Sequence, residues 1–358
     1  MPLFEGLRRR FGSGGEAITF HAYHEIDPGP RWQALFEATW PAYHEWFLRE
    51  GDAARPSYLH CRRALREHMP ELVPTWEALV ELAGGGDAAA RMLSLWCPPR
   101  FIAGCSQVTL RGSRGPALVR NYDYAPSQFE GVIASTGYVR RVAGSSDCLW
   151  GLLDGVNDAG LAASLTFGGR PEHGEGFGIA LVLRYLLETC ETAAQAAGVL
   201  ERLPVHFSYN VMLLDDTGHG LLTYVRPDRP ALTQPQRVAT NHQESIEWHA
   251  YAEATHTQER ETHLRELLAE DPPPDEEQVI GAFLHEPLYG HHFDQGFGTL
   301  YTAVLRPEQR GIEYRWPEAS WEQRLDSFEE GERTVMLRPR AGGGRLRVPW
   351  RALQPVEV

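Results

Sequence analysis

Residues 101–124, FIAGCSQVTLRGSRGPALVRNYDY, constrain the fold most, because two runs of alternating apolar and polar residues flank a Gly/Pro turn. Such a pattern predicts two antiparallel strands joined as a β-hairpin. Pairing Leu110 with Ala117 across the turn places Cys105 opposite Tyr122. The predicted hairpin therefore holds a cysteine at the start of its first strand.

The same register places Arg120 on the face of the hairpin that carries Cys105, within diagonal reach of the thiol. A guanidinium there favours the thiolate, which is the nucleophilic form of cysteine. Strict alternation puts Asp123 on the opposite face. We therefore expect the strand to end or bulge near Asn121 and Tyr122, so that the Asp123 carboxylate joins the thiol.

Gly104 precedes the cysteine and predicts a strained peptide bond, because glycine adopts backbone angles closed to other residues. Attack of the Cys105 thiol on the Gly104 carbonyl would convert the amide into a thioester. Hydrolysis of that thioester would free Cys105 as a new N-terminus. The released α-amine, with a reference pKa of about 7.7 to 8.0, could then act as the local base without a histidine partner.

The other four cysteines fit small buried hydrophobic residues. Cys61 and Cys190 fall in helical patterns, whereas Cys97 and Cys148 lie close to tryptophans in the sequence. The total of five cysteines is odd, and no two have C-x-x-C spacing. We therefore expect neither a disulfide framework nor a zinc ribbon.

The patterns outside the hairpin predict helices first and sheets afterwards. Aromatic and aliphatic residues at helical spacing predict helices over 30–100. From residue 105 onward, short β-like runs alternate with Gly, Asp and Pro signals, and three helices are predicted among them, over 178–190, 192–203 and 257–269. Sheets with helices packed outside them fit this order.

Composition excludes several classes of function. The 34 basic and 48 acidic residues give a formal net charge of -14, which argues against a nucleic-acid or anionic-membrane partner. Every basic residue is Arg, so pyridoxal Schiff bases, a P-loop lysine and Ser-Lys dyads are excluded. No apolar run approaches the roughly 20 residues of a membrane helix, and we expect a cytoplasmic protein.

The motif GCSQV...RNYDY resembles the N-terminal-nucleophile (Ntn) hydrolases of the penicillin acyltransferase and choloylglycine hydrolase superfamily. The chain is most similar to bacterial self-processing enzymes of the acyl-CoA:6-aminopenicillanic acid acyltransferase type, over about residues 101 to 306. This resemblance implies an α+β fold, a four-layer αββα sandwich with a mostly helical N-terminal segment. Residues 1–104 would form that segment, as a pro-segment or α subunit, and residues 105–358 the Ntn domain, or β subunit. No cofactor is implied, and the cleaved fragments are expected to stay associated.

The resemblance also implies roles for residues in the hairpin and beyond it. Cys105 matches the nucleophile, Arg120 the arginine beside the thiol, and Asp123 the carboxylate that holds the amino group of the nucleophile. In the motif DGVNDAGLAASLTF, Thr166 stands where choloylglycine hydrolases carry an Asn. Its backbone N–H is the candidate oxyanion donor at that position.

Two later motifs complete the implied site. VATNHQ matches the Thr-Asn segment whose side-chain amide completes the oxyanion hole, which makes Asn241 a candidate donor. TQERETHLRELL resembles the Ser-x-x-Arg start of a helix, with Thr257 in place of Ser. This match places Arg260 as a second arginine of the site.

A histidine-rich stretch contains His285, His291, His292 and Asp294. Adjacent histidines on a strand point apart, and no H-x-x-x-H or H-E-x-x-H helix supports them, so we expect no metal. We interpret the stretch as a loop near the substrate mouth. His291 and His292, together with Tyr124, are therefore candidate pocket residues.

These observations predict a self-processing cysteine amidohydrolase or acyltransferase, which cleaves or transfers an acyl group from a linear amide or thioester through an acyl-enzyme on Cys105. Its expected partner is a small-molecule acyl substrate, and a homo-oligomer is compatible with the resemblance. A second interpretation is an unprocessed hydrolase with a Cys-His pair, since 15 histidines are present. A third is a non-catalytic binding module that retains the fold.

Overall fold

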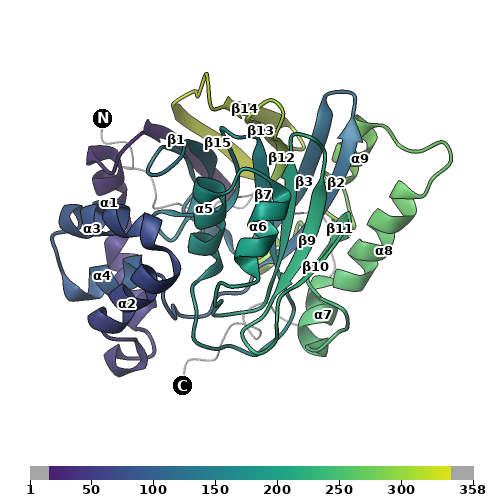
Figure 1. Cartoon of the computed structure of the whole chain (residues 1–358). Helices are drawn as coiled ribbons and strands as arrows, with labels where there is room; N and C mark the ends of the chain where they lie inside the picture. Colours follow the sequence, from purple (N-terminus) through teal and green to yellow (C-terminus); the bar gives the residue numbers. More distant parts are fainter. Residues whose placement is uncertain (1–15, 340–358) are drawn as a thin grey trace.

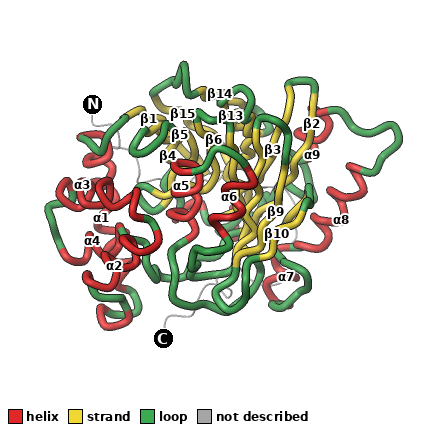
Figure 2. The backbone as a smooth tube through the Cα atoms, in the orientation of Figure 1, coloured by secondary structure: helices red, strands yellow, loops and turns green. Residues whose placement is uncertain are grey.

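Two β-sheets pack face to face at the centre of the molecule, and helices lie outside them (Figures 1 and 2). The computed structural model describes residues 16–339. The nine-stranded sheet has the spatial order β10 (Leu232–Gln234), β9 (Gly220–Val225), β8 (Tyr209–Asp215), β7 (Leu161–Phe167), β6 (Gly151–Asn157), β5 (Val142–Asp147), β4 (Val132–Thr136), β1 (Glu16–Glu25) and β15 (Gly331–Leu337). The six-stranded sheet has the order β11 (Val238–Ala239), β2 (Gly104–Gly112), β3 (Gly115–Tyr124), β12 (Gly298–Arg306), β13 (Gly311–Trp316) and β14 (Ala319–Arg324).

Helices cover the outer face of each sheet and one end of the sandwich. Two of them, α5 (Ile179–Thr189) and α6 (Ala193–Leu200), pack on the nine-stranded sheet, whereas α8 (Thr257–Leu268) and α9 (Glu276–Ala282) pack on the six-stranded sheet. These four layers confirm the predicted αββα sandwich. The remaining α-helices of the described part are α1 (Pro30–Leu48), α2 (Tyr58–His68), α3 (Val73–Leu82), α4 (Asp87–Leu93) and α7 (His249–Thr255).

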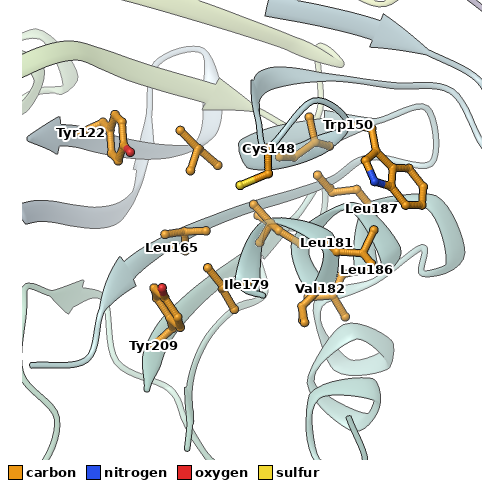
Figure 3. Close-up of a cluster of buried hydrophobic side chains, with 14 of the residues drawn as sticks. Tyr122, Cys148, Trp150, Leu165, Ile179, Leu181, Val182, Leu186, Leu187 and Tyr209 are labelled. Carbon is orange, nitrogen blue, oxygen red and sulfur yellow. The ribbon is translucent and has the colours of Figure 1, made fainter. Parts of the chain in front are cut away.

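Helix α5 illustrates how apolar residues hold a helix against the nine-stranded sheet. It is apolar nearly all round, and almost every side chain along it is buried, as expected for a helix covered on both sides. Leu181, Val182, Leu186 and Leu187 pack in the cluster drawn in Figure 3. Burial of each such side chain contributes roughly 1.5 to 3 kcal/mol to folding. No α-helix in residues 16–339 is long and apolar enough to span a membrane.

The segment before Cys105 is mostly helical, as predicted, but it also contributes a strand to the large sheet. Strand β1 lies between β4, to which it is parallel, and β15, to which it is antiparallel. Ile18, Phe20 and Ala22 alternate along this strand and are fully buried, which is the pattern of a strand with one face in the core. The N-terminal segment is therefore built into the sandwich, with helices α1 to α4 grouped beside it (Figure 1).

Candidate active site

The hairpin of β2 and β3 has the predicted register. The paired residues include Cys105 with Tyr122, Gln107 with Arg120, and Leu110 with Ala117. Cys105 is the second residue of β2 and is 0% exposed. One face of the hairpin meets the nine-stranded sheet, because β2 packs on β7, and the other face meets helices α8 and α9.

The thiol faces the other sheet and contacts a buried arginine. Nη2 of Arg120 lies 3.5 Å from the Sγ of Cys105. The same guanidinium donates through Nη1 to Asp154 Oδ2 at 2.7 Å and to the Tyr301 hydroxyl at 3.1 Å, and through Nε to the Leu165 carbonyl at 2.8 Å. Tyr301 also donates to Asp154 Oδ2 at 2.7 Å. Arg120 is thus held in place by a buried network that spans both sheets.

At the thiol, burial and the nearby arginines act in opposite directions. Burial raises the pKa of the Cys105 thiol, and although Arg120 and Arg260 act in the opposite direction, burial is the larger effect. Arg120 therefore favours the thiolate, as expected, but its effect on the pKa is smaller than that of removing the sulfur from water. In the intact chain the Cys105 thiol is therefore protonated near neutral pH.

Asp123 lies on the helix-facing side of the hairpin, away from the thiol. Strand β3 continues through Asp123 opposite Gly104 without a bulge against β2. Its register against β12 does shift here, but the extra residue lies on β12, between Thr299 and Tyr301. The expected break of β3 near Asn121 and Tyr122 is therefore wrong. Thr299 donates to Asp123 Oδ1 at 2.6 Å, and Arg260 Nη1 lies 3.7 Å from Oδ2. The carboxylate therefore approaches the backbone on the N-terminal side of the cysteine.

Asn241 and Arg260 hold that backbone from the same side. The Cys105 N–H donates to Asn241 Oδ1 at 2.8 Å, and Arg260 Nη2 donates to the same oxygen at 2.7 Å. Arg260 Nη1 donates to the Cys105 carbonyl at 2.5 Å. The Asn241 side-chain amide donates to the carbonyls of Phe167 at 3.1 Å and Ala103 at 3.4 Å. The structure thus brings Asn241 and Arg260 together at the cysteine.

Two threonines that differ from the family pattern support the loop that carries Asn241. The Thr257 hydroxyl accepts from the Asn241 N–H at 2.7 Å and donates to Thr240 Oγ1 at 2.9 Å. Thr166 donates from its hydroxyl to the Thr240 carbonyl at 2.7 Å. Thr257 therefore retains the hydroxyl that a serine would supply. The role of the Thr166 N–H as an oxyanion donor stays a prediction.

Gly104 is required by close packing. It is not one of the described glycines with positive φ, so the expected glycine-specific backbone angles are not found, and the strained peptide bond stays a prediction. A Cβ at this position would lie 2.8 Å from Cζ of Phe297 and 3.2 Å from Cβ of Asp123. A larger residue before Cys105 would therefore displace one of these two side chains.

The candidate pocket residues fall in different places. Tyr124 lines a cleft of about 290 Å³. His291 Nδ1 lies 3.3 Å from the Arg338 carbonyl, and His292 is half-buried, with its pKa lowered mainly by burial. From the same loop, Phe297 is the residue that packs at Gly104.

Three residues of the site were missed in the sequence. Asp154 is the first residue of the DGVN motif, so the motif itself could be recognised in the sequence. Its ion pair with Arg120 could not, because Arg120 lies on the other sheet. Tyr301 comes from β12, far along the chain. Tyr251 donates from its hydroxyl to the Ala103 carbonyl at 2.6 Å and so binds the segment before the cysteine. Only tertiary packing brings these groups together.

Comparison with known proteins gives one family and several distant structures. The chain matches the family described as acyl-coenzyme A:6-aminopenicillanic acid acyl-transferase over residues 110–321. Penicillin V acylase from Agrobacterium tumefaciens is 14% identical, with a TM-score of 0.42, and the match covers 64% of this chain and 90% of that chain. An N-acylethanolamine-hydrolyzing acid amidase ortholog from Caenorhabditis elegans is 17% identical, with a TM-score of 0.44, covering 64% and 100%. A mutant of the conjugated bile acid hydrolase from Clostridium perfringens is 11% identical, with a TM-score of 0.43, covering 64% and 96%. No curated protein matches the chain.

Proposed function

Because this chain belongs to the acyl-coenzyme A:6-aminopenicillanic acid acyl-transferase family, we propose that it is a self-processing cysteine amidohydrolase or acyltransferase. Its substrate is a small linear acyl amide or acyl thioester. One observation carries the proposal, which is that three separate parts of Cys105 each contact a different predicted residue. Arg120 contacts the sulfur, Asn241 the backbone nitrogen and Arg260 the carbonyl oxygen.

The first proposed step is self-cleavage. The Sγ of Cys105 attacks the carbonyl carbon of Gly104, the C–N bond between the two residues breaks, and the amide nitrogen takes up the thiol proton. Water then hydrolyses the thioester, which leaves a carboxylate on Gly104 and a free thiol and α-amine on Cys105. The burial of Cys105 and the raised pKa of its thiol support a chain that is inactive toward other substrates until this cleavage.

Self-cleavage would also free the oxyanion donor. The side-chain amide of Asn241 donates to the Ala103 carbonyl in the intact chain, and this acceptor leaves when the new C-terminus moves away. One N–H of Asn241 would then be available to a substrate carbonyl beside Cys105. The backbone N–H of Thr166 is the proposed second donor.

The proposed catalytic base is the new α-amine, which takes the thiol proton and returns it to the leaving group. Asp123 and Arg260 lie beside the Cys105 backbone and would orient the amine. Arg120 would then stabilise the thiolate once the site is open to water, because its guanidinium already contacts the sulfur. Water or an amine completes the cycle by accepting the acyl group.

We also propose that the two fragments stay associated after cleavage. Strand β1 precedes the cleavage point and lies between β4 and β15, which follow it. Its separation would expose Ile18, Phe20 and Ala22, all fully buried, together with the unpaired edges of two strands.

The two alternative functions predict different chemistry at Cys105. Within residues 16–339, the sulfur of Cys105 is hydrogen-bonded to Arg120, and no histidine forms a hydrogen bond with it at 4.0 Å or less. This observation weighs against a Cys-His pair. A binding module would need neither cleavage nor an accessible thiol, so it predicts that Cys105 forms no acyl-enzyme.

Acyl-enzyme trapping tests the proposal. The processed protein is mixed with a p-nitrophenyl alkanoate and quenched in acid, and its peptides are analysed by mass spectrometry. We expect one acyl group on Cys105 and none after Cys105→Ala, whereas Cys190→Ala serves as the matched control and retains the label. Labelling of another residue at the same rate, or no labelling of folded protein, would contradict the proposed nucleophile.

A further inference from the structure

A cleft of about 290 Å³ opens between helix α1, the end of β3 and the loop that follows it. Much of its wall is aromatic and is formed by Trp46, Phe101, Tyr124 and Phe129. Phe101 packs against Tyr124 with ring centroids 6.4 Å apart. Such a wall suits the hydrocarbon part of a ligand.

Two carboxyl groups also line this cleft, and both are largely buried. Glu130 is 5% exposed and Asp147 is 8% exposed. The hydroxyl of Tyr43 donates to Glu130 Oε1 and lies 3.4 Å from Asp147 Oδ1. The Leu149 N–H donates to Glu130 Oε1 at 2.6 Å. Glu130 Oε2 is buried and makes no hydrogen bond of standard geometry within residues 16–339, although the nearby Ser146 hydroxyl lowers the pKa of Glu130.

The carboxyl pair lacks a direct counter-ion. Within the described residues, no arginine or histidine nitrogen lies within 4.0 Å of Glu130 or Asp147. Burial, followed by the charge of Asp147, raises the pKa of Glu130 to about 8, and burial raises the pKa of Asp147 to about 6. Arg120 acts on Asp147 in the opposite direction from a greater distance. A cation in the cleft would therefore balance the charge of two carboxyl groups that have no direct counter-ion.

The cleft lies next to the route of the cleaved segment. Phe101 comes four residues before Cys105, so the extended segment spans at most about 14 Å. Tyr124 follows Tyr122, which pairs with Cys105, and their two rings are 5.6 Å apart. Figure 3 shows Cys148, another residue of the cleft wall, in the same buried cluster as Tyr122. The cleft and the thiol are thus neighbours on one side of the hairpin.

The segment before Cys105 also indicates which part of a substrate enters the cleft. During self-cleavage the Gly104 carbonyl becomes the acyl group on Cys105, and the chain attached to it runs back to Phe101 in the cleft wall. An acyl group from a substrate would be attached to the same sulfur. Its chain would therefore follow the path that residues 102–104 take in the intact chain.

We propose that the cleft binds an acyl group that carries a protonated primary amine, with the hydrocarbon chain against the aromatic wall and the ammonium on Glu130 and Asp147. The assignment to the acyl group rests on the proposed function. Binding of an alkylammonium does not, because it requires no catalysis.

Direct binding tests the ammonium site. Full-length Cys105→Ala protein is titrated at pH 8 in a calorimeter with hexylammonium chloride or with 1-hexanol, which has the same chain without the charge. We expect hexylammonium to bind at least about tenfold more tightly, because hydrogen bonds to charged groups are the stronger ones. Equal affinities for the two probes would overturn the proposal.

Matched variants assign the binding to the two carboxyls. Glu130→Gln and Asp147→Asn, singly and together, should lower hexylammonium affinity toward that of hexanol and leave hexanol unchanged. Glu45→Gln removes a carboxylate from the exposed face of the same helix α1 and should change neither. If the double variant does not fold, the affinities of the two single variants for hexylammonium test the assignment. A preference for hexylammonium that survives both single changes would contradict the assignment.

Kinetics separate the acyl assignment from the proposed function. The processed protein is assayed with 6-aminohexanoyl and hexanoyl p-nitroanilides, and we expect kcat/KM at least about tenfold higher for the amino compound. Equal hydrolysis of both would overturn the acyl assignment and leave the proposed function intact. Hydrolysis of neither, together with tight hexylammonium binding, would contradict the proposed function and support the ammonium site.

Discussion

Arg120 lies with Nη2 3.5 Å from the sulfur of Cys105, and the same guanidinium forms a fully buried ion pair with Asp154 at 2.7 Å. The cation beside the nucleophile is thus anchored by a carboxylate from the opposite sheet. The thiol, the arginine and the aspartate form one unit across the interior of the sandwich.

Asp154→Asn should destabilise the fold by about 3 to 5 kcal/mol, because removal of one partner leaves a buried charge uncompensated. Urea unfolding of the Cys105→Ala protein measures this change. Asp158→Asn is the control, since it breaks an ion pair with Arg140 in which the aspartate is 43% exposed, and it should cost less than about 1 kcal/mol. Equal losses in the two variants would refute the anchoring role.

Thr257→Val should slow self-cleavage by about tenfold, because it removes the acceptor of the Asn241 N–H, a bond of 2.7 Å. Thr257→Ser retains the hydroxyl and should cleave at nearly the wild-type rate. A time course of fragment appearance after synthesis in a cell-free system measures both rates. The role of Thr257 in positioning Asn241 fails if the valine and serine variants cleave equally fast.

Gly104→Ala should slow self-cleavage by about tenfold or more, because the added Cβ meets Phe297 at 2.8 Å and a displaced carbonyl is attacked poorly. The second change Phe297→Leu removes the aromatic ring and should restore part of the rate. The same time course applies to both variants. If Gly104→Ala cleaves normally, or if the double variant is as slow as Gly104→Ala alone, packing at this position does not control the reaction.

The free energy of unfolding should fall between about pH 5 and pH 8, because the folded chain retains carboxyl protons that the unfolded chain has already released. The responsible groups are Glu130 and Asp147, whose pKa values are raised to about 8 and about 6. Tyr43 and Cys148 also face the pair, and their own pKa values are raised by burial, so both stay neutral over this range. The decline should not exceed about 1.4 kcal/mol per pH unit for each retained proton.

Denaturant titrations at several pH values measure this slope. Glu130→Gln combined with Asp147→Asn should flatten it, whereas Glu45→Gln should leave it unchanged. Stability that rises over the same range in the wild-type protein, or an unchanged slope in the double variant, would show that the pair is ionised in the folded chain.

The hairpin could be predicted from sequence because its information is local. The turn between β2 and β3 and the alternation of their residues fix the register, and so place Arg120 beside Cys105. The same alternation placed Asp123 on the far face. The expected bulge came from the assumption that the carboxylate must reach the sulfur, whereas its neighbours are Arg260 and Thr299 on the backbone side.

The remaining parts of the site depend on contacts between distant segments. Asp154 was visible in a motif, but its pairing with Arg120 requires two sheets to pack face to face. Glu130 and Asp147 carry no local signal, because their shared partner Tyr43 comes from helix α1. Family resemblance supplied Asn241 and Arg260, which no pattern in their own neighbourhood would have brought to the cysteine.

Intact-mass analysis of the purified full-length protein tests the central claim most directly. We predict two fragments, residues 1–104 and 105–358, whose masses sum to that of the chain plus one water. Cys105→Ala should remain a single species, and Cys148→Ala, a change of another buried cysteine, should still be cleaved. A single full-length wild-type species that hydrolyses acyl amides would contradict self-processing at Cys105.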